Sequence, residues 1–242
     1  MSSRFHASPP AACADCRAGR RAIYGPTLET SPEKIAGLRR GTNVFPANKL
    51  LLREGEIASL CFTIYSGWAC RYRQHGDGRR QILSFLLPGD TVMMECLFYP
   101  GLKLACSVKS LTSISVCAFS VTDMVALMRA SPEQEEMFSA SLHRGVTATN
   151  RRLFDLGRRS ALGRIAQLIL ELEDRLQHRD MVKGGRFHFP ARQTDIADAT
   201  GLTVIHVNRL LKSLRTKNII EIDRKHITIK NSAALREIAE EE

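Results

Sequence analysis

The segment from Gln193 to Arg215, QTDIADATGLTVIHVNRLLKSLR, holds the residues best suited to recognising another molecule. Ala197 is small enough for two helices to cross closely, and Gly201 permits the sharp turn between them. Ile196, Leu202, Val207 and Leu210 are expected to point inward. A second helix with a polar outer face at its start fits the major groove of DNA. The spacing therefore predicts a helix-turn-helix that contacts base pairs.

The side chains on that outer face differ in what they can recognise. Arg209 can donate two parallel hydrogen bonds to O6 and N7 of guanine, Asn208 can bind adenine or a phosphate, and Ile205 can only contact a thymine methyl. Gln193 and Thr194, at the positive end of the first helix, are expected to bind a phosphate. Residues 186–217 contain six basic and two acidic residues. The alternative is a solvated basic helix that binds nothing. The predicted DNA contacts are Gln193, Thr194, Thr203, Val204, Ile205, His206, Asn208 and Arg209.

Composition indicates an ordinary globular protein with a basic surface. The chain has 242 residues, 44% of them hydrophobic, and a net charge of +10, which favours a polyanionic partner such as double-stranded DNA. No apolar stretch approaches the roughly 18 residues of a membrane span, and the first residues do not resemble a secretory signal. We therefore expect a cytoplasmic protein with no membrane partner. The seven cysteines are an odd number, which favours reduced thiols or metal ligands over disulfides.

The chain divides into segments of different texture. Residues 1–30 have no sustained periodicity and are expected to be an extension that contains two close cysteines. Residues 31–128 consist of short apolar runs separated by turns, such as those at residues 75–78 and 88–90, which predict a β-roll. Residues 158–242 predict a helix, a strand, the helix-turn-helix and a hairpin, followed by a solvated acidic tail. The expected fold class is α+β.

Residues 129–157 are predicted to form one long helix that begins after Ser131, a good capping residue. Its apolar residues recur at spacings of three and four, which draws one narrow stripe along the helix. Such a stripe favours pairing with the same helix of a second copy, although packing on the strand domain is the alternative. The predicted dimer contacts are Phe138, Leu142, Val146, Thr149 and Leu153, and Leu156 continues the stripe.

The order of these elements resembles the Crp/Fnr family of bacterial transcription regulators over residues 30–235. The motifs that resemble the family are GDGRRQILSFLLPGD in the roll, LGRRS after the long helix, and DIADATGLTVIHVNRLLKSLR. The resemblance implies a double-stranded jelly roll like that of cyclic nucleotide-binding domains, a dimerisation helix and a winged helix-turn-helix. It also implies a homodimer on a palindromic operator, with recognition helices about 34–36 Å apart, and RNA polymerase as a partner.

Two departures from the family pattern change what we expect of the chain. Ile205 stands where family members usually have a glutamate, so contact with cytosine by a carboxylate is lost and a different half-site is expected. Members that bind cyclic AMP have Gly-Glu and Arg-Ser or Arg-Thr where this chain has Met93-Met94 and Leu104-Ala105. Because a buried phosphate without a matching cation is costly, cyclic nucleotide binding is not expected.

Resemblance to the oxygen-sensing branch of the family implies an iron–sulfur cluster. Cys13 and Cys16 resemble two of its amino-terminal ligands and Cys117 resembles the ligand in the roll, but Ala22 replaces the remaining cysteine. A four-iron cluster normally takes four thiolates. The Cys-x-x-Cys pair also suits zinc or thiol–disulfide exchange, or is a remnant without a ligand.

The leading hypothesis is a dimeric regulator whose roll senses an unidentified, redox-linked or other signal and which is not an enzyme. One alternative is a regulator that needs no effector because its sensor is degenerate. A cupin-like metal enzyme would need clustered histidines, and the seven histidines of this chain are isolated in sequence. A module that uses its helix-turn-helix to bind protein is a further alternative, which the salt dependence of DNA binding would distinguish.

Overall fold

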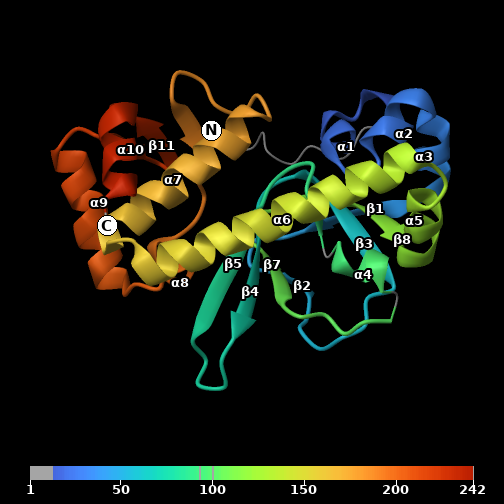
Figure 1. Ribbon diagram of the computed structural model, residues 1–242, viewed down its shortest axis with the longest axis horizontal. Helices are drawn as coiled ribbons and strands as arrows, with labels where there is room; N and C mark the ends of the chain where they lie inside the picture. The colour runs from blue at the N-terminus through green and yellow to red at the C-terminus, as the bar shows by residue number, and fades with distance from the viewer. Residues whose placement is uncertain (1–12, 93, 100, 242) are drawn as a thin grey trace. The chain divides into compact units, whose positions relative to one another are not determined.

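The chain forms two compact units in the computed structural model, which describes residues 13–92, 94–99 and 101–241 (Figure 1). The first unit holds the described residues up to Gly78 together with Leu83–Val146. The second holds Arg79–Ile82 and the described residues from Thr147 onward. Residues 1–12 of the expected extension and Met93 lie outside the described residues.

The first unit contains the predicted roll. In the described residues its strands form two four-stranded sheets, ordered β1-β8-β3-β6 and β2-β7-β4-β5, and the first residues of β5 are assigned to the second unit (Figure 1). The predicted turns are present, and Gly78 and Gly89 adopt φ angles of 88° and 93°, which favour glycine. The strands are β1 (Arg39–Phe45), β2 (Leu50–Leu52), β3 (Leu60–Ser66), β4 (Ala69–Gln74), β5 (Arg80–Leu86), β6 (Thr91–Val92), β7 (Ser107–Ser110) and β8 (Ile114–Ser120).

The amino-terminal residues pack on the roll as short helices, which the sequence did not predict. Residues from 13 onward form η1 (Cys13–Asp15), α1 (Arg17–Arg21), α2 (Gly25–Thr30) and α3 (Pro32–Leu38). Tyr24, Leu28 and Ile35 are buried in the same hydrophobic cluster as Phe119 of β8, and the rings of Tyr24 and Phe119 are 5.1 Å apart. Helices this short are not stable alone and depend on such packing. The described part of the expected extension therefore belongs to the core of the roll.

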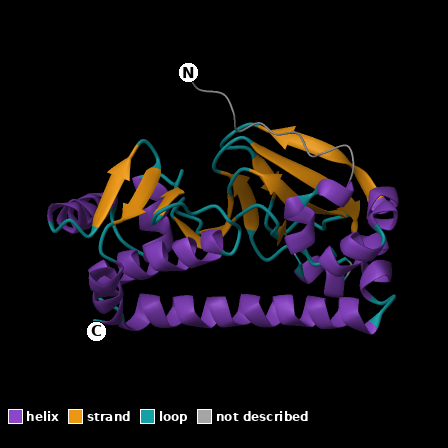
Figure 2. Cartoon of the chain, turned by 90° about the horizontal axis from the view of Figure 1, so that it is seen from above, coloured by secondary structure: helices purple, strands orange, loops and turns teal. Residues whose placement is uncertain are grey.

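Two further helices of the first unit flank its later strands, and a third leads out of it. They are α4 (Glu95–Phe98), α5 (Val121–Met128) and α6 (Pro132–Arg158). Ser131 accepts a hydrogen bond from the amide of Gln134 at 3.3 Å, as a residue capping a helix should. With 27 residues, α6 is about 40 Å long, and Figure 2 shows it as one uninterrupted helix. The predicted long helix is confirmed.

The second unit is a helical domain with a small sheet. The hydroxyl of Ser160 accepts a hydrogen bond from Gly163 at 3.0 Å, and this cap starts α7 (Ala161–Gln177). The buried face of α7 packs against later helices, including α10. The sequence predicted a solvated acidic tail there, but Leu235, Ile238 and Ala239 of α10 are buried. The other elements are β9 (Arg186–His188), α8 (Gln193–Thr200), α9 (Val204–Thr216), β10 (Ile220–Asp223), β11 (His226–Ile229) and α10 (Ser232–Glu240), with sheet order β10-β11-β9. None of the helices in the described residues has the length and apolar character of a membrane span.

Candidate nucleic-acid interface

The turn between α8 and α9 has the geometry that the sequence predicted. Gly201 ends α8 with a φ of 67°, and the amide of Leu202 donates to the carbonyl of Ala197 at 3.1 Å. The hydroxyl oxygen of Thr203 accepts a hydrogen bond from the amide of His206 at 3.2 Å and so caps α9. At the start of α8, the carboxylate of Asp195 accepts from the amide of Arg192 at 2.8 Å. These bonds fix where α8 begins and ends and where α9 begins.

The buried and exposed residues of α9 separate into two faces. Val207, Leu211 and Leu214 are buried at helical spacing and anchor the helix. The sequence placed Leu202 and Leu210 in this buried set, but both are only half-buried. Within α9 the inward stripe runs through Leu211 rather than Leu210. The outer face contains the predicted contacts Thr203, Val204, Ile205, Asn208 and Arg209, all exposed, whereas His206 is half-buried.

Two residues of the outer face have the chemistry of base recognition. The side chain of Ile205 is 85% exposed and offers an apolar surface of the kind that contacts a thymine methyl. The guanidinium of Arg209 makes no hydrogen bond or ion pair with any described residue, so its donors are available for a guanine. Gln193 and Thr194 are exposed at the amino terminus of α8, where backbone amides favour a phosphate.

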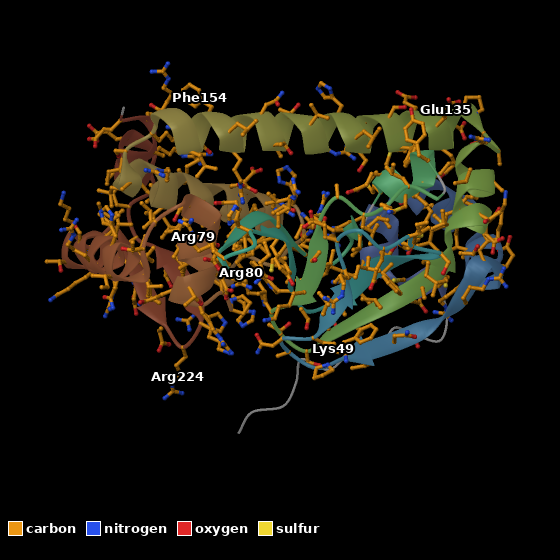
Figure 3. All side chains as sticks on the ribbon, turned by 90° about the horizontal axis from the view of Figure 1, so that it is seen from below. Lys49, Arg79, Arg80, Glu135, Phe154 and Arg224 are labelled. Atoms are coloured by element: carbon orange, nitrogen blue, oxygen red, sulfur yellow. The ribbon has the colours of Figure 1, made fainter. Side chains whose placement is uncertain are left out.

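The hairpin of β10 and β11 adds cations that the sequence reasoning missed. Arg224 and Lys225 form its two-residue turn with φ angles of 42° and 68°. Both angles are unfavourable for residues with a β-carbon, and Asn-Gly is the usual choice there. Figure 3 shows Arg224 projecting from the tip of this wing. In the sequence, these additional cations are indicated by the adjacent Arg224 and Lys225 between two strands of alternating apolar residues.

Two histidines face each other across the wing sheet. His188 of β9 pairs with His226 of β11, and their rings are 5.2 Å apart. Burial, together with the neighbouring His226 and Lys225, lowers the pKa of His188 to about 4. At neutral pH His188 is therefore uncharged, and it supplies packing rather than positive charge.

The apolar stripe of α6 is buried in its first turns and exposed further along the helix. Phe138 is only 6% exposed and belongs to the core of the first unit. In the single chain the first turns of α6 pack on the roll and already cover Phe138, whereas its role as a dimer contact stays a prediction. Leu142 is half-buried, whereas Val146, Thr149 and Leu153 are exposed.

The middle of α6 lacks cover within the described chain. All residues from 143 to 151 are exposed, which is more than two turns of helix without a covered face. Val146 and Leu153 are 58% and 65% exposed, and Phe154, which Figure 3 shows projecting from the helix, is 54% exposed. From Leu142 the spacing of the stripe is that of a heptad repeat, which is typical of helices that pair.

The structure brings Cys13, Cys16 and Cys117 together, as the resemblance implied. All three are buried and line one small cavity with Tyr24 and Phe119. The thiol of Cys16 accepts a hydrogen bond from the amide of Gly19 at 3.2 Å. Burial raises the pKa of Cys16 and raises that of Cys117 to about 11, so both are neutral thiols at pH 7.

These surroundings do not fit a four-iron cluster. The cavity has a volume of about 10 Å³, the room of a single water at most. Ala22, which stands where the family has its remaining cysteine, is buried and has no metal-binding atom. No group of three or more His, Cys, Asp or Glu side chains in the described part of the chain is arranged to hold a metal ion. The described surroundings of Cys13, Cys16 and Cys117 therefore do not support the suggested metal site.

The described residues at the phosphate-binding positions of the roll do not match those that a cyclic nucleotide requires. Of the residues at the phosphate-binding positions, Leu104 is buried and Ala105 exposed, and neither has a charge. Arg71 of β4 is half-buried beside these segments, but its guanidinium pairs with Glu95 at 2.6 Å and contacts the sulfur of Cys106 at 3.4 Å. Because Glu95 neutralises this arginine, the residues do not fit a cyclic phosphate.

Comparison with known proteins identifies both parts of the chain. The cyclic nucleotide-binding domain profile matches residues 42–131, and the Crp-like helix-turn-helix domain profile matches residues 163–238. The transcriptional activatory protein AadR of Rhodopseudomonas palustris is 28% identical over 207 residues, which cover 86% of this chain and 84% of AadR. The nitrogen fixation regulation protein FixK of Rhizobium meliloti is 27% identical over 216 residues, covering 88% and 91% of the two chains.

A solved structure shares the fold. FixK2 from Bradyrhizobium japonicum superposes with a TM-score of 0.73 at 23% identity, covering 82% of this chain and 96% of FixK2. The two matching domains, the long helix between them and the regulators among its relatives agree with one another. The chain therefore belongs to the Crp/Fnr family of transcription regulators, with a cyclic nucleotide-binding domain and a DNA-binding helix-turn-helix domain.

Proposed function

We propose that this chain binds a palindromic DNA operator as a homodimer and regulates transcription together with RNA polymerase, without enzymatic activity. The observation that carries the proposal is the outer face of α9, where Ile205 is 85% exposed and Arg209 has no partner among the described residues. Arg209 contacts a guanine in each half-site. Ile205, which lies four residues or about one helical turn before Arg209, contacts a thymine methyl. Gln193, Thr194 and Thr203 bind phosphates that set the register.

The second chain is held through α6. Val146, Thr149 and Leu153 lie on the heptad stripe of a helix whose middle is exposed on every side. Pairing with the same stripe of a second copy covers them and joins two recognition helices, as a palindromic operator requires.

The roll supplies the regulatory input. Its signal is not a cyclic nucleotide in this proposal, since Arg71 is paired with Glu95 and the positions of the phosphate ligands are uncharged. The same ion pair favours a second candidate, a regulator whose roll is a fixed structural part and whose activity follows its abundance. Operator affinity that is equal in aerobic and anaerobic preparations supports this second candidate, and a difference supports a redox-linked input.

Selection of binding sites from random duplex DNA with the full-length protein tests the proposal. We expect an inverted repeat with guanine at the same place in both halves. Affinity for that site should fall about a thousandfold or more between about 50 and 200 mM salt, because several phosphate contacts release counterions. Recovery of no enriched sequence, or affinity that does not change with salt, would refute the proposal and favour a module that binds protein.

A further inference from the structure

The winged-helix unit contains a cavity that DNA recognition does not explain. Its volume is about 720 Å³, within the range of about 300–1,000 Å³ typical of small-molecule sites. It lies between α7, α8, α9 and the wing strands, and residues of this unit alone line it. Buried apolar side chains form its floor: Ile165, Ile169, Ile196, Leu211, Ile220 and Ile227.

The rim of the cavity is positively charged. Lys212, Arg215 and Lys225 line it, and none of them forms an ion pair with a described residue. Glu221 is the acidic residue of the lining, but its carboxylate pairs with Lys230 at 2.7 Å and is thus already neutralised. A ligand that reaches the rim therefore meets cations without matching anions.

The combination of floor and rim selects a class of ligand. A DNA phosphate needs only the cations, because a phosphodiester is charged and gains nothing from an apolar floor. Burial of an apolar body against the isoleucines would be favourable, and an acidic head would match the lysines and the arginine. We propose that this cavity binds a small amphipathic organic anion, with an apolar chain or ring and one carboxylate or phosphate.

Occupancy of the cavity would oppose DNA binding, a consequence that rests on the proposed function. Gln193 and Asn208, two of the predicted DNA contacts, also line the cavity. A ligand head held by Lys212 lies one helical turn from Asn208, on the face of α9 that approaches DNA. The ligand and the operator therefore compete for this part of α9.

Titration calorimetry of the full-length protein with decanoate tests the site directly, without DNA. We expect saturable binding of one decanoate per chain. Arg215→Gln removes one charge-assisted contact and should weaken binding about tenfold. Lys217→Gln removes the same charge from an exposed residue outside the lining and should leave the affinity unchanged. Ala191→Phe places a ring at the half-exposed edge of the cavity and should abolish binding, with thermal unfolding measured to show that the variant is folded.

Control ligands and variants distinguish this site from a neutral pocket, nonspecific adsorption and a lipid surface. Decanol has the same chain without the charge, so equal binding of decanol would overturn the assigned head group. Equal loss in the Arg215 and Lys217 variants, or binding that does not saturate, would overturn the site. Binding to phosphatidylglycerol vesicles but not to free decanoate would overturn a soluble ligand in favour of a lipid surface. If the protein binds decanoate but selects no operator, the proposed ligand site is supported and the proposed function is refuted.

Discussion

Leu153→Asp is expected to separate the proposed dimer into folded monomers. In the single chain the side chain of Leu153 is 65% exposed. An aspartate at this position is therefore solvated, and the free energy of unfolding of the subunit should change little. In the paired state the same carboxylate would lie between two helices, together with its copy from the second chain. The substitution thus acts on association rather than on folding.

The size of the effect follows from the exposed fraction. Full burial of a leucine side chain contributes about 1.5–3 kcal/mol, so the 65% that pairing can still cover contributes about 1–2 kcal/mol. Two leucines meet in a symmetric dimer, which makes about 2–4 kcal/mol, and bringing two like charges out of water adds to this cost. A total of about 4 kcal/mol raises the dissociation constant of the dimer roughly a thousandfold.

Sedimentation velocity over a range of protein concentrations measures this dissociation constant. Leu102→Asp is the matched control, since Leu102 is 48% exposed in the loop after α4 and lies outside the stripe; it should leave the dimer unchanged. Phe138→Asp provides the contrast, because it buries a charge in the core of the roll and should lower the thermal stability of the first unit. A dissociation constant for Leu153→Asp within threefold of wild type would refute the assigned seam.

Three other predictions follow from the second unit. Arg209→Ala should cost about 2 kcal/mol of binding free energy in each half-site, which lowers the affinity for a palindromic operator about a thousandfold by fluorescence anisotropy. Lys217→Ala should mainly reduce the salt dependence of binding. Equal effects of the two substitutions on sequence specificity would contradict the assignment of Arg209. Replacing Arg224 by Asn together with Lys225 by Gly should raise the melting temperature by relieving two positive φ angles worth about 1 kcal/mol each, and an unchanged or lower value would contradict the strain. The pKa of His188 is lowered to about 4, so the unfolded chain binds more protons than the folded chain between about pH 6.5 and 4. Urea denaturation should therefore show the free energy of unfolding falling as pH drops through that window. A His188→Gln variant with the same pH dependence would disprove this.

The helix-turn-helix could be predicted because several local requirements coincide in one short segment. Gly201 permits the positive φ, Ala197 permits the close crossing, and Thr203 caps the next helix. These demands are satisfied by neighbours in sequence, so they are visible without a structure. The hairpin after α9 was predictable for the same reason, since alternation defines its strands.

Features that depend on distant packing were not predictable in the same way. The periodicity of α6 shows which face is apolar but not what covers it, so it could not show that Phe138 lies in the core of the first unit. In α10, the acidic residues concealed the apolar stripe of Leu235 and Ile238 that packs on α7. The first helices are too short for periodicity to define, and their burial depends on Phe119 far along the chain.

The exposed middle of α6, residues 143–151, makes the activity of the proposed dimer depend on how much of the protein the cell makes. Below the dissociation constant, the number of assembled dimers grows with the square of chain concentration, because each dimer forms in an encounter between two copies of the chain. Doubling synthesis at low abundance would then give about four times as many competent molecules, so expression of the target genes would respond to dose with a threshold rather than in proportion.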